Sequence, residues 1–481
     1  MRQAVAVVAL STILTGCVVG PNYRLPSEAA INQDVAKQPL LDAKGYTTDS
    51  QSPPPNWWKL YDDPVLNDMV QRALQQNTDL RVAMANLERA RAGVQFADEQ
   101  GGFSGGVSAL QERTQEAGEQ YLLPEKVPVT NASNFGINVT YEIDLFGTLK
   151  RGVEAAKADS DAALAAKDVA RVAVVSDVVH AYVENCGSGA ELSVARQAVA
   201  EQQSRGDLIA RLHALGRADV SETSRQETAI REIEATIPKY SARQHIAQYR
   251  LAALLAESPA ELPETVRECT RLPQLESKIP IGDGTALLKR RPDVRESERK
   301  LAASTARIGV SIGALYPNVI LGASTGLTGE TGDLGMGSTA RWSVGPMISW
   351  TFPVNGARAR ISEARAEQRA ALASFDGVVL QALKEVQSSL AGYEASMDQL
   401  NALERAHASA VESASDAHRM FVGGRATYLD DLDASRTLTA NELRLTESKV
   451  DVAMSQVDLF KSLGGGWETS SDMITPATAS R

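Results

Sequence analysis

Two short segments of the chain hold residues whose types and spacing could do chemistry. The first, Leu14-Thr15-Gly16-Cys17, places a thiol directly after small residues and the short apolar run from Ala4 to Leu14. This order is typical of a bacterial lipobox, where the chain is cleaved before the cysteine and its thiol receives lipid. The run is too short to cross about 30 Å of hydrocarbon. We therefore expect residues 1–16 to be a lipoprotein signal peptide and Cys17 to be lipidated.

The second segment contains the acidic residues Asp430 and Asp433, with Arg436 shortly after them. Because they are three residues apart, the two carboxylates would lie on one face of a helix. One interpretation is that acids simply favour a helix start through the helix macrodipole. The other is that, in a symmetric assembly, the same carboxylates form rings that attract cations and repel anions.

The sequence shows no signature of catalysis. It has no phosphate-binding loop and no histidine pair at the helical spacing that metal sites use. It carries 60 acidic and 49 basic residues, a net charge of −11, which disfavours nucleic-acid binding. We expect no enzyme activity and no cofactor beyond a covalent lipid on Cys17.

Two further cysteines, Cys186 and Cys269, remain after the lipobox. In an oxidising compartment they could pair. Sequence does not show whether their Cα atoms approach closely enough, so a disulfide and two separate structural thiols both stay open.

Proline marks where very long helices are permitted. None occurs between Pro128 and Pro238 or between Pro353 and Pro476, and proline breaks helix interiors. The segment from Val354 to Val422 would extend roughly 100 Å as one helix at 1.5 Å per residue. A heptad seam within it indicates left-handed coiled packing. The seam consists of Val379, Leu383, Val386, Leu390, Tyr393, Met397 and Leu400.

The two halves of the chain repeat each other at a spacing of about 208 residues. Each half would run helix, strand pair, long helix, turn and long helix. Such a duplicated unit predicts a symmetric assembly. The matched residues are Gly216-Arg217-Ala218 with Gly424-Arg425-Ala426, Asp144-Leu145-Phe146-Gly147 with Pro353-Val354-Asn355-Gly356, Arg151 with Arg360, and Glu154 with Glu363.

Four segments show the alternation typical of strands, clearly in 134–145 and 341–352 and more weakly in 103–110 and 318–327. A half-buried sheet of a soluble protein would explain alternation alone. Together with a signal peptide and tryptophan at strand ends, segments of about ten residues favour a transmembrane barrel. The stretches 111–133 and 327–340 would then be surface loops.

The number of strands predicts an oligomer. Open edges are forbidden in lipid, and the smallest barrels have about eight strands. Four strands therefore cannot close a barrel around a pore, and several chains must contribute to it.

Recognisable motifs are spread over nearly the whole chain, from Cys17 to Trp467. They are Cys17-Val18-Val19-Gly20-Pro21-Asn22-Tyr23, Trp57-Trp58, Asp63-Pro64-Val65-Leu66, Asn77-Thr78-Asp79-Leu80, Tyr141-Glu142-Ile143-Asp144-Leu145-Phe146-Gly147, Arg290-Arg291-Pro292-Asp293-Val294-Arg295, Ala306-Arg307-Ile308-Gly309 and Tyr316-Pro317. In their order and spacing the motifs resemble one family, the TolC-type outer-membrane efflux proteins, and within it the lipidated NodT-like branch.

This resemblance implies an α+β membrane protein. It implies a homotrimer in which four strands per chain build one twelve-stranded transmembrane β-barrel, continued by a long α-helical coiled barrel in the periplasm with a girdle partway along. The expected location is the cell outer membrane, anchored in its lipid. The expected partners are a periplasmic adaptor (membrane fusion) protein and an inner-membrane pump of the RND type, with no nucleic acid. The expected function is the outer-membrane channel of a tripartite efflux or export system.

The resemblance also assigns site residues. Leu429, Asp430, Asp433 and Arg436 would form the periplasmic gate. The two helical tips would contact the adaptor, through Gly216 and Arg217 at the first and Gly423, Gly424 and Arg425 at the second. The family usually has threonine after that arginine, and this chain has Ala426 instead.

We expect six segments along the chain. They are the signal peptide 1–16, a lipidated and girdle segment 17–62, a first repeat 63–257 with its strand pair at 103–145, a girdle linker 258–287, a second repeat 288–463 with its strand pair at 317–352, and a girdle tail 464–481. Two alternatives remain: a structural coiled-coil outer-membrane lipoprotein without a pore, and a passive porin. Alternating strands disfavour the first, and the large helical share disfavours the second.

Overall fold

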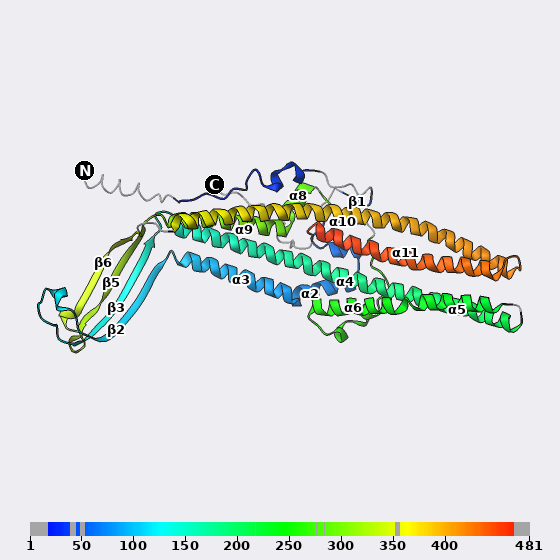
Figure 1. The fold of residues 1–481 in the computed structure, drawn as a ribbon, viewed down its shortest axis with the longest axis horizontal. Coiled ribbons are helices and arrows are strands. Elements are labelled where there is room, and N and C mark those ends of the chain that lie inside the picture. Colours follow the sequence, from blue (N-terminus) through cyan, green and yellow to red (C-terminus); the bar gives the residue numbers. More distant parts are fainter. Residues whose placement is uncertain are drawn as a thin grey trace. The chain divides into compact units, whose positions relative to one another are not determined.

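The computed structural model describes residues 18–38, 45–48, 53–216, 218–275, 278–282, 284–351 and 356–465. Their contacts form two compact units, and each unit draws on both sequence repeats. The strand unit comprises the described parts of 1–26, 86–164 and 296–375, and the helical unit comprises the described parts of 27–85, 165–295 and 376–481. The long helices contribute residues to both units (Figure 1).

The strand unit contains one antiparallel sheet with the order β2-β3-β5-β6. Its strands are β2 (Phe103–Thr114), β3 (Thr130–Ile143), β5 (Asn318–Glu330) and β6 (Ala340–Ser349). The hairpins β2–β3 and β5–β6 are the two expected strand pairs, and β3 joins them by pairing with β5. The loops between the paired strands are shorter than the expected 111–133 and 327–340. The reason is that the β2–β3 and β3–β5 ladders continue through polar residues that show no apolar alternation.

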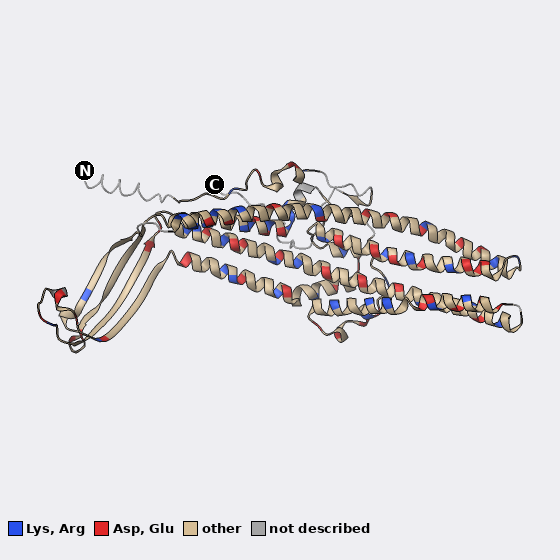
Figure 2. Cartoon of the chain, in the orientation of Figure 1, with Lys and Arg blue, Asp and Glu red and all other residues tan. Residues whose placement is uncertain are grey.

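One face of this sheet is apolar and exposed, as the alternation predicts. Phe103, Val107 and Trp342 expose 79%, 82% and 78% of their surface. Aromatic rings gather where the strands meet the helices: Phe103 lies 5.0 Å from Tyr141 between ring centroids. Charged residues are frequent along the helices and sparse on the strands (Figure 2).

Two helices are exceptionally long, as the proline-free stretches predict. They are α4 (Thr148–Ala214) and α10 (Ala357–Val422), with 67 and 66 residues. Each would measure roughly 100 Å at 1.5 Å per residue. The chain returns from them through α5 (Val220–Glu234), α6 (Ile237–Leu255) and α11 (Tyr428–Ser462). The predicted start of the second helix, Val354, lies outside the described residues.

Shorter helices complete both units. They are α2 (Pro64–Gln76), α3 (Thr78–Glu99), α7 (Glu264–Arg267), α8 (Gly284–Arg290) and α9 (Pro292–Gly313). Pro64 and Pro292 each begin a helix, a position where the missing N–H costs nothing. None of the described helices is both long and apolar enough to cross a membrane.

The helical unit has an aromatic and aliphatic core. Trp57 and Trp58 are fully buried, and Trp57 stacks on Phe460 with centroids 4.6 Å apart. The predicted heptad seam packs into this core through Val386, Leu390 and Tyr393, and Met397 and Leu400 lie against it. Val379, earlier in the seam, is also fully buried. Strand β1 (Thr47–Thr48) pairs in parallel with β4 (Ile279–Pro280) in the same unit.

Cys186 and Cys269 form a disulfide, with their Cα atoms 4.8 Å apart. The bond joins the middle of α4 to the segment that follows α7. The sequence left this pairing open, and the structure decides it.

Candidate functional site

The second helical tip, which connects α10 to α11, carries the residues expected at a gate and at an adaptor contact. Gly424 has a φ of +66°, in the left-handed region that glycine adopts without strain. The Arg425 N–H donates to the Met420 carbonyl at 2.8 Å, which closes the end of α10. Gly423, Gly424 and Arg425 are all exposed, so this tip can meet another protein.

Asp430 caps the start of α11. Its Oδ2 accepts from the Thr427 N–H at 2.9 Å and from the Thr427 hydroxyl at 2.7 Å. These bonds favour the ionised carboxyl and hold the pKa of Asp430 below its usual range. The helix-start interpretation is therefore correct for Asp430, and a carboxylate ring remains compatible with it because the side chain is exposed.

The expected gate residues share one exposed side of α11. Leu429 exposes 48% of its surface, and Asp430, Asp433 and Arg436 are exposed as well. Positions 429, 433 and 436 follow the four-and-three spacing that places side chains on one helix face. The structure thus brings these residues together along one chain; the ring that they would form needs further copies.

Arg436 bonds to the neighbouring helix α5. Its Nη2 lies 2.9 Å from Oε2 of Glu232. Both side chains are largely exposed, so a single pair of this kind stabilises by about 0–1 kcal/mol. Arg436, which is expected at the gate, thus has an ion-pair partner on a neighbouring helix of the same chain, and this pair could tether the two helices.

The opposite side of α11 holds a buried polar network that the sequence analysis missed. Asp431 is 3% exposed, and its Oδ2 lies 3.0 Å from Arg205 Nη1 on α4 and 3.3 Å from His418 Nδ1 on α10. A sequence signal existed, because Asp431 shares the apolar side of α11 with Tyr428 and Leu432. An acid at such a position must be paired when buried.

Hydrogen bonds extend this network to α5. The Tyr428 hydroxyl donates to Gln226 Oε1 at 2.7 Å, and Gln226 Nε2 donates to Gln202 Oε1 at 3.0 Å. Gln202 Nε2 in turn donates to the Ser435 hydroxyl at 3.0 Å. Burial raises the pKa of Tyr428 to about 12, which keeps it a donor. The network fastens α11 to α4 and α5, beside the face that carries the expected gate.

The first tip, between α4 and α5, has a similar construction. Gly216 has a φ of +68°, and its N–H donates to the His213 carbonyl at 2.9 Å. Asp219 and Glu222 form a capping box at the start of α5. Arg217, the expected adaptor contact here, lies outside the described residues, as does Cys17.

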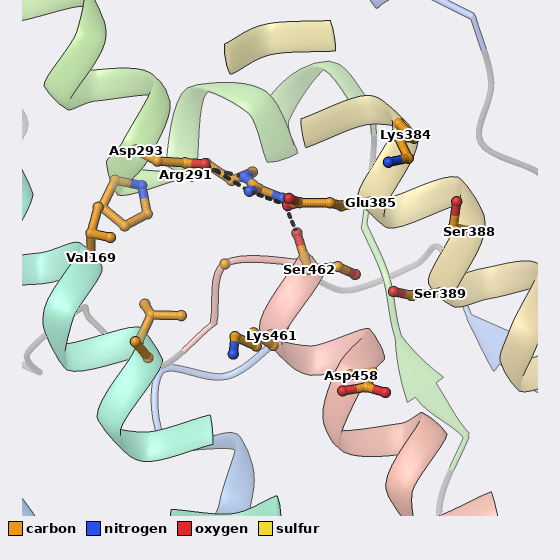
Figure 3. A pocket seen from close by; sticks show the side chains of 14 residues that line it. Val169, Arg291, Asp293, Lys384, Glu385, Ser388, Ser389, Asp458, Lys461 and Ser462 are labelled. Atoms are coloured by element: carbon orange, nitrogen blue, oxygen red, sulfur yellow. Dashed lines mark hydrogen bonds and ion pairs between the residues drawn. The ribbon is translucent and has the colours of Figure 1, made fainter. Parts of the chain in front are cut away.

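A cavity of about 490 Å³ lies in the helical unit between α4, α9, α10 and α11 (Figure 3). Arg291, 8% exposed, forms its wall. Its guanidinium donates to Asp293 and Glu385 at 2.7 Å, and to the Ser462 carbonyl at 2.7 Å. Burial lowers the pKa of Arg291, but these carboxylates outweigh it and leave the pKa raised. The conspicuous Arg-Arg-Pro-Asp-Val-Arg motif thus ties three helices together.

Comparisons with known proteins agree with this architecture. The chain is 26% identical to nodulation protein T of Rhizobium leguminosarum bv. trifolii over 466 residues, or 95% of this chain and 96% of that protein. It is 28% identical to outer membrane protein OprJ of Pseudomonas aeruginosa over an alignment of 490 positions, which covers 98% of this chain and 98% of that protein. A solved structure of the outer-membrane channel OprN superposes with a TM-score of 0.85 at 32% identity, covering 94% of this chain and 100% of that one.

The family model described as outer membrane efflux protein matches residues 69–257 and 285–465. These two matches cover both sequence repeats, from α2 to the end of α11. The chain belongs to the outer membrane efflux protein family.

Proposed function

We propose that this chain is one subunit of a homotrimeric outer-membrane duct, which passes substrates from a periplasmic adaptor and an RND-type inner-membrane pump to the exterior. One observation carries the proposal: an antiparallel sheet with an exposed apolar face continues directly into helices of roughly 100 Å. The sheet suits a membrane-spanning wall, and the long helices suit the wall of a conduit. The relatives point the same way, since they are named as outer membrane and channel proteins.

The sheet has the dimensions and the surface of a membrane-spanning wall. Its strands have 10 to 14 residues, and a tilted transmembrane strand needs about 9–11. Aromatic rings collect at the helix-proximal end, where Phe146 stacks on Tyr316 at 4.4 Å and Trp350 donates to the Leu315 carbonyl at 3.3 Å. Such rings are typical of a membrane interface.

Closure of the barrel follows from the strand order. β2 and β6 are the sheet edges, and unpaired edges are not tolerated in lipid. Pairing β6 of one copy with β2 of the next removes every edge. Three copies would give twelve strands, the number that the family resemblance implies.

The internal repeat predicts the register of that joint. Within one chain, Val139 of β3 faces Ala323 of β5. By the spacing of the repeat-related Gly147 and Gly356, Val139 corresponds to Ile348 of β6. The β2–β3 and β5–β6 hairpins pair in the same register with respect to the repeat. Ala323 of β5 therefore corresponds to Ala109 of β2. We therefore expect Ile348 to face Ala109 of the next copy, with both side chains on the apolar face.

Cysteine cross-linking tests this register. Directly opposed strand residues have Cβ atoms about 4.5–5.5 Å apart, within reach of a disulfide. The double variant Ala109→Cys with Ile348→Cys should give covalent trimers under oxidation. The matched control pairs Ala109→Cys with Met347→Cys, whose side chain points to the other face, and should give none. The opposite pattern would reject this joint.

The periplasmic end would hold the gate. Leu429, Asp430, Asp433 and Arg436 lie on one exposed face of α11, beside the tips that would meet the adaptor. Threefold symmetry would convert Asp430 and Asp433 into two carboxylate rings, which favour cations. Cargo choice would rest with the pump, since nothing in these residues recognises a particular substrate.

Planar bilayers test the gate. Because Asp430 also caps α11, an alanine would confuse a lost cap with a lost charge. Asp430→Asn with Asp433→Asn keeps oxygen acceptors and removes the charge, so it should weaken cation preference and block by multivalent cations. Asp430→Glu with Asp433→Glu keeps the charge and should retain both. Wild-type selectivity in the asparagine variant would remove these residues from the pore, and a wild-type protein without conductance would favour a structural lipoprotein.

A further inference from the structure

The first described residues are fastened at the turn between β3 and α4, which is formed by Phe146 and Gly147. The Val19 N–H donates to the Phe146 carbonyl at 3.0 Å. Gly147 has a φ of +74°, and a Cβ there would lie 2.8 Å from Cγ1 of Val18. Val18 therefore sits against the turn. Cys17 lies outside the described residues and directly precedes Val18 in the sequence.

One buried side chain holds this segment. Arg151, near the start of α4, is 3% exposed. Its Nε donates to the Val19 carbonyl at 3.1 Å, and its Nη2 donates to the Gly20 carbonyl at 3.2 Å and to Asn22 Oδ1 at 2.7 Å. Its Nη1 pairs with Glu154 at 2.6 Å. All three nitrogens are used, and three of the four acceptors belong to the N-terminal segment.

Close packing adds to these bonds. Gly20 has a φ of +88°, and a Cβ on it would lie 2.5 Å from the Cα of Gly309 on α9. Only glycine permits this approach. Further along, the Tyr23 hydroxyl donates to Glu298 at 3.1 Å, and the Arg299 guanidinium lies 5.7 Å from the centre of the Tyr23 ring. The segment from Val18 to Tyr23 is thus fixed at several points.

The sequence repeat provides an internal comparison. Gly356 and Arg360 stand at the start of α10 as Gly147 and Arg151 stand at the start of α4. Gly356 has a φ of +77°, but no described residue lies within 4 Å of a Cβ built on it. Arg360 is exposed, and its side chain forms no ion pair with any described residue. Among the described residues, no segment is clamped across this second helix start, whereas three of the four acceptors of Arg151 belong to the N-terminal segment.

We propose that Arg151 is a positioning residue for the lipid anchor, which holds residues 18–22 so that the acyl chains on Cys17 enter the bilayer beside the helix-proximal end of β3. The proposal rests on the proposed function in one respect, that this end of the sheet lies at the membrane surface. A lipid on a free tether would sample any position around the subunit. Fixed by Arg151, each anchor enters at one place, and three anchors enter symmetrically.

Photo-cross-linking locates the acyl chains. Cells expressing the full chain are fed a fatty acid that carries a diazirine, and the purified lipidated protein is irradiated in its membrane. We expect cross-linked peptides from 143–149 and the adjoining part of β3. Arg151→Gln should lower the yield of these peptides by about tenfold. The yield follows the fraction of molecules in which residues 18–22 are docked, and the variant shifts that fraction toward the locally opened state. Arg360→Gln is the matched control and should leave the yield unchanged.

Proteolysis gives a second readout. Trypsin can cleave after the exposed Arg24 and release a short lipopeptide, once the backbone leaves its docked position. Release of this lipopeptide should be about tenfold faster in Arg151→Gln. It should be similarly faster in Gly20→Ala, because the added Cβ would collide with Gly309 and displace the segment. Gly45→Ala controls for strain alone, since Gly45 has a φ of +94° and no described residue within 4 Å of a Cβ built on it.

The outcomes separate this proposal from the proposed function. Cross-links spread over the whole subunit in the wild type, or an unchanged pattern and unchanged release in Arg151→Gln, would overturn the role of Arg151. Both assays report where the segment and its lipid lie, whether or not the channel conducts. Conductance of the wild type in bilayers tests the duct separately.

Discussion

Loss of the disulfide between Cys186 and Cys269 should destabilise the helical unit by a predictable amount. The bond spans a sequence separation of 83 residues. Closing a loop of this length in the unfolded chain costs about 4.5 kcal/mol in the chain-entropy model, and measured values for native disulfides run from about 2 to 5 kcal/mol. The bond therefore stabilises by restricting the unfolded chain, in addition to any packing of its sulfurs in the core.

For a chain of this size, about 4.5 kcal/mol corresponds to a lowering of the Tm by about 5 °C. Calorimetry at one fixed scan rate is the suitable measurement, because large membrane proteins often unfold irreversibly. Reduction of the wild type removes the cross-link and keeps both side chains, whereas Cys186→Ala with Cys269→Ala removes both. The reduced wild type should account for most of the shift seen in the double variant.

Thiol counting accompanies the calorimetry. If Cys17 carries lipid as expected, a maleimide under denaturing conditions should label no thiol before reduction and two after it. A third labelled thiol would contradict lipidation of Cys17. If the oxidised and reduced proteins melted within about 1 °C of each other, the entropic reasoning would be refuted for this loop.

Three further changes follow from the described contacts. Arg436→Ser should raise baseline conductance in bilayers, and Glu232→Gln should do the same if their ion pair is the tether; an effect of only the first would place the tether elsewhere. Arg425→Glu should keep the trimer on native gels and lose cross-linking to the adaptor, so intact cross-linking would remove this tip from the interface. Arg291→Met should lower stability by about 2–3 kcal/mol, because it leaves Asp293 and Glu385 without their charged donor; a Tm equal to that of the wild type would contradict this.

The long helices and the strand pairs could be predicted because their signals are local. A proline-free stretch with a heptad seam allows little except a long helix, and Val379 and Val386 are buried as expected. Strand ends were predicted less well. Gln111 to Thr114 lack alternation, and they join β2 because β3 offers partners for their backbone groups. Hydrogen-bond pairing between strands that are distant in sequence cannot be predicted from the residues of one strand alone.

The tip of α11 shows where sequence reasoning stopped. The spacing of Asp430 and Asp433 predicts their shared face, but it does not show that Asp430 can cap the helix and remain exposed at the same time. Asp431 was overlooked because its partners, Arg205 and His418, are distant in sequence. The same holds for Arg151, whose match with Arg360 was visible while its contacts with residues 19–22 were not.

The open edges of the sheet have a consequence for how a cell must produce this protein. β2 offers 12 residues and β6 offers 10 at edges where any other extended chain could add itself. A newly exported copy is therefore prone to aggregate from the time its hairpins form until its neighbours arrive. Tethering copies to one surface raises their effective concentration and shortens that interval. We expect lipidation to matter most during biogenesis, as a means of limiting the time that a solitary subunit must survive.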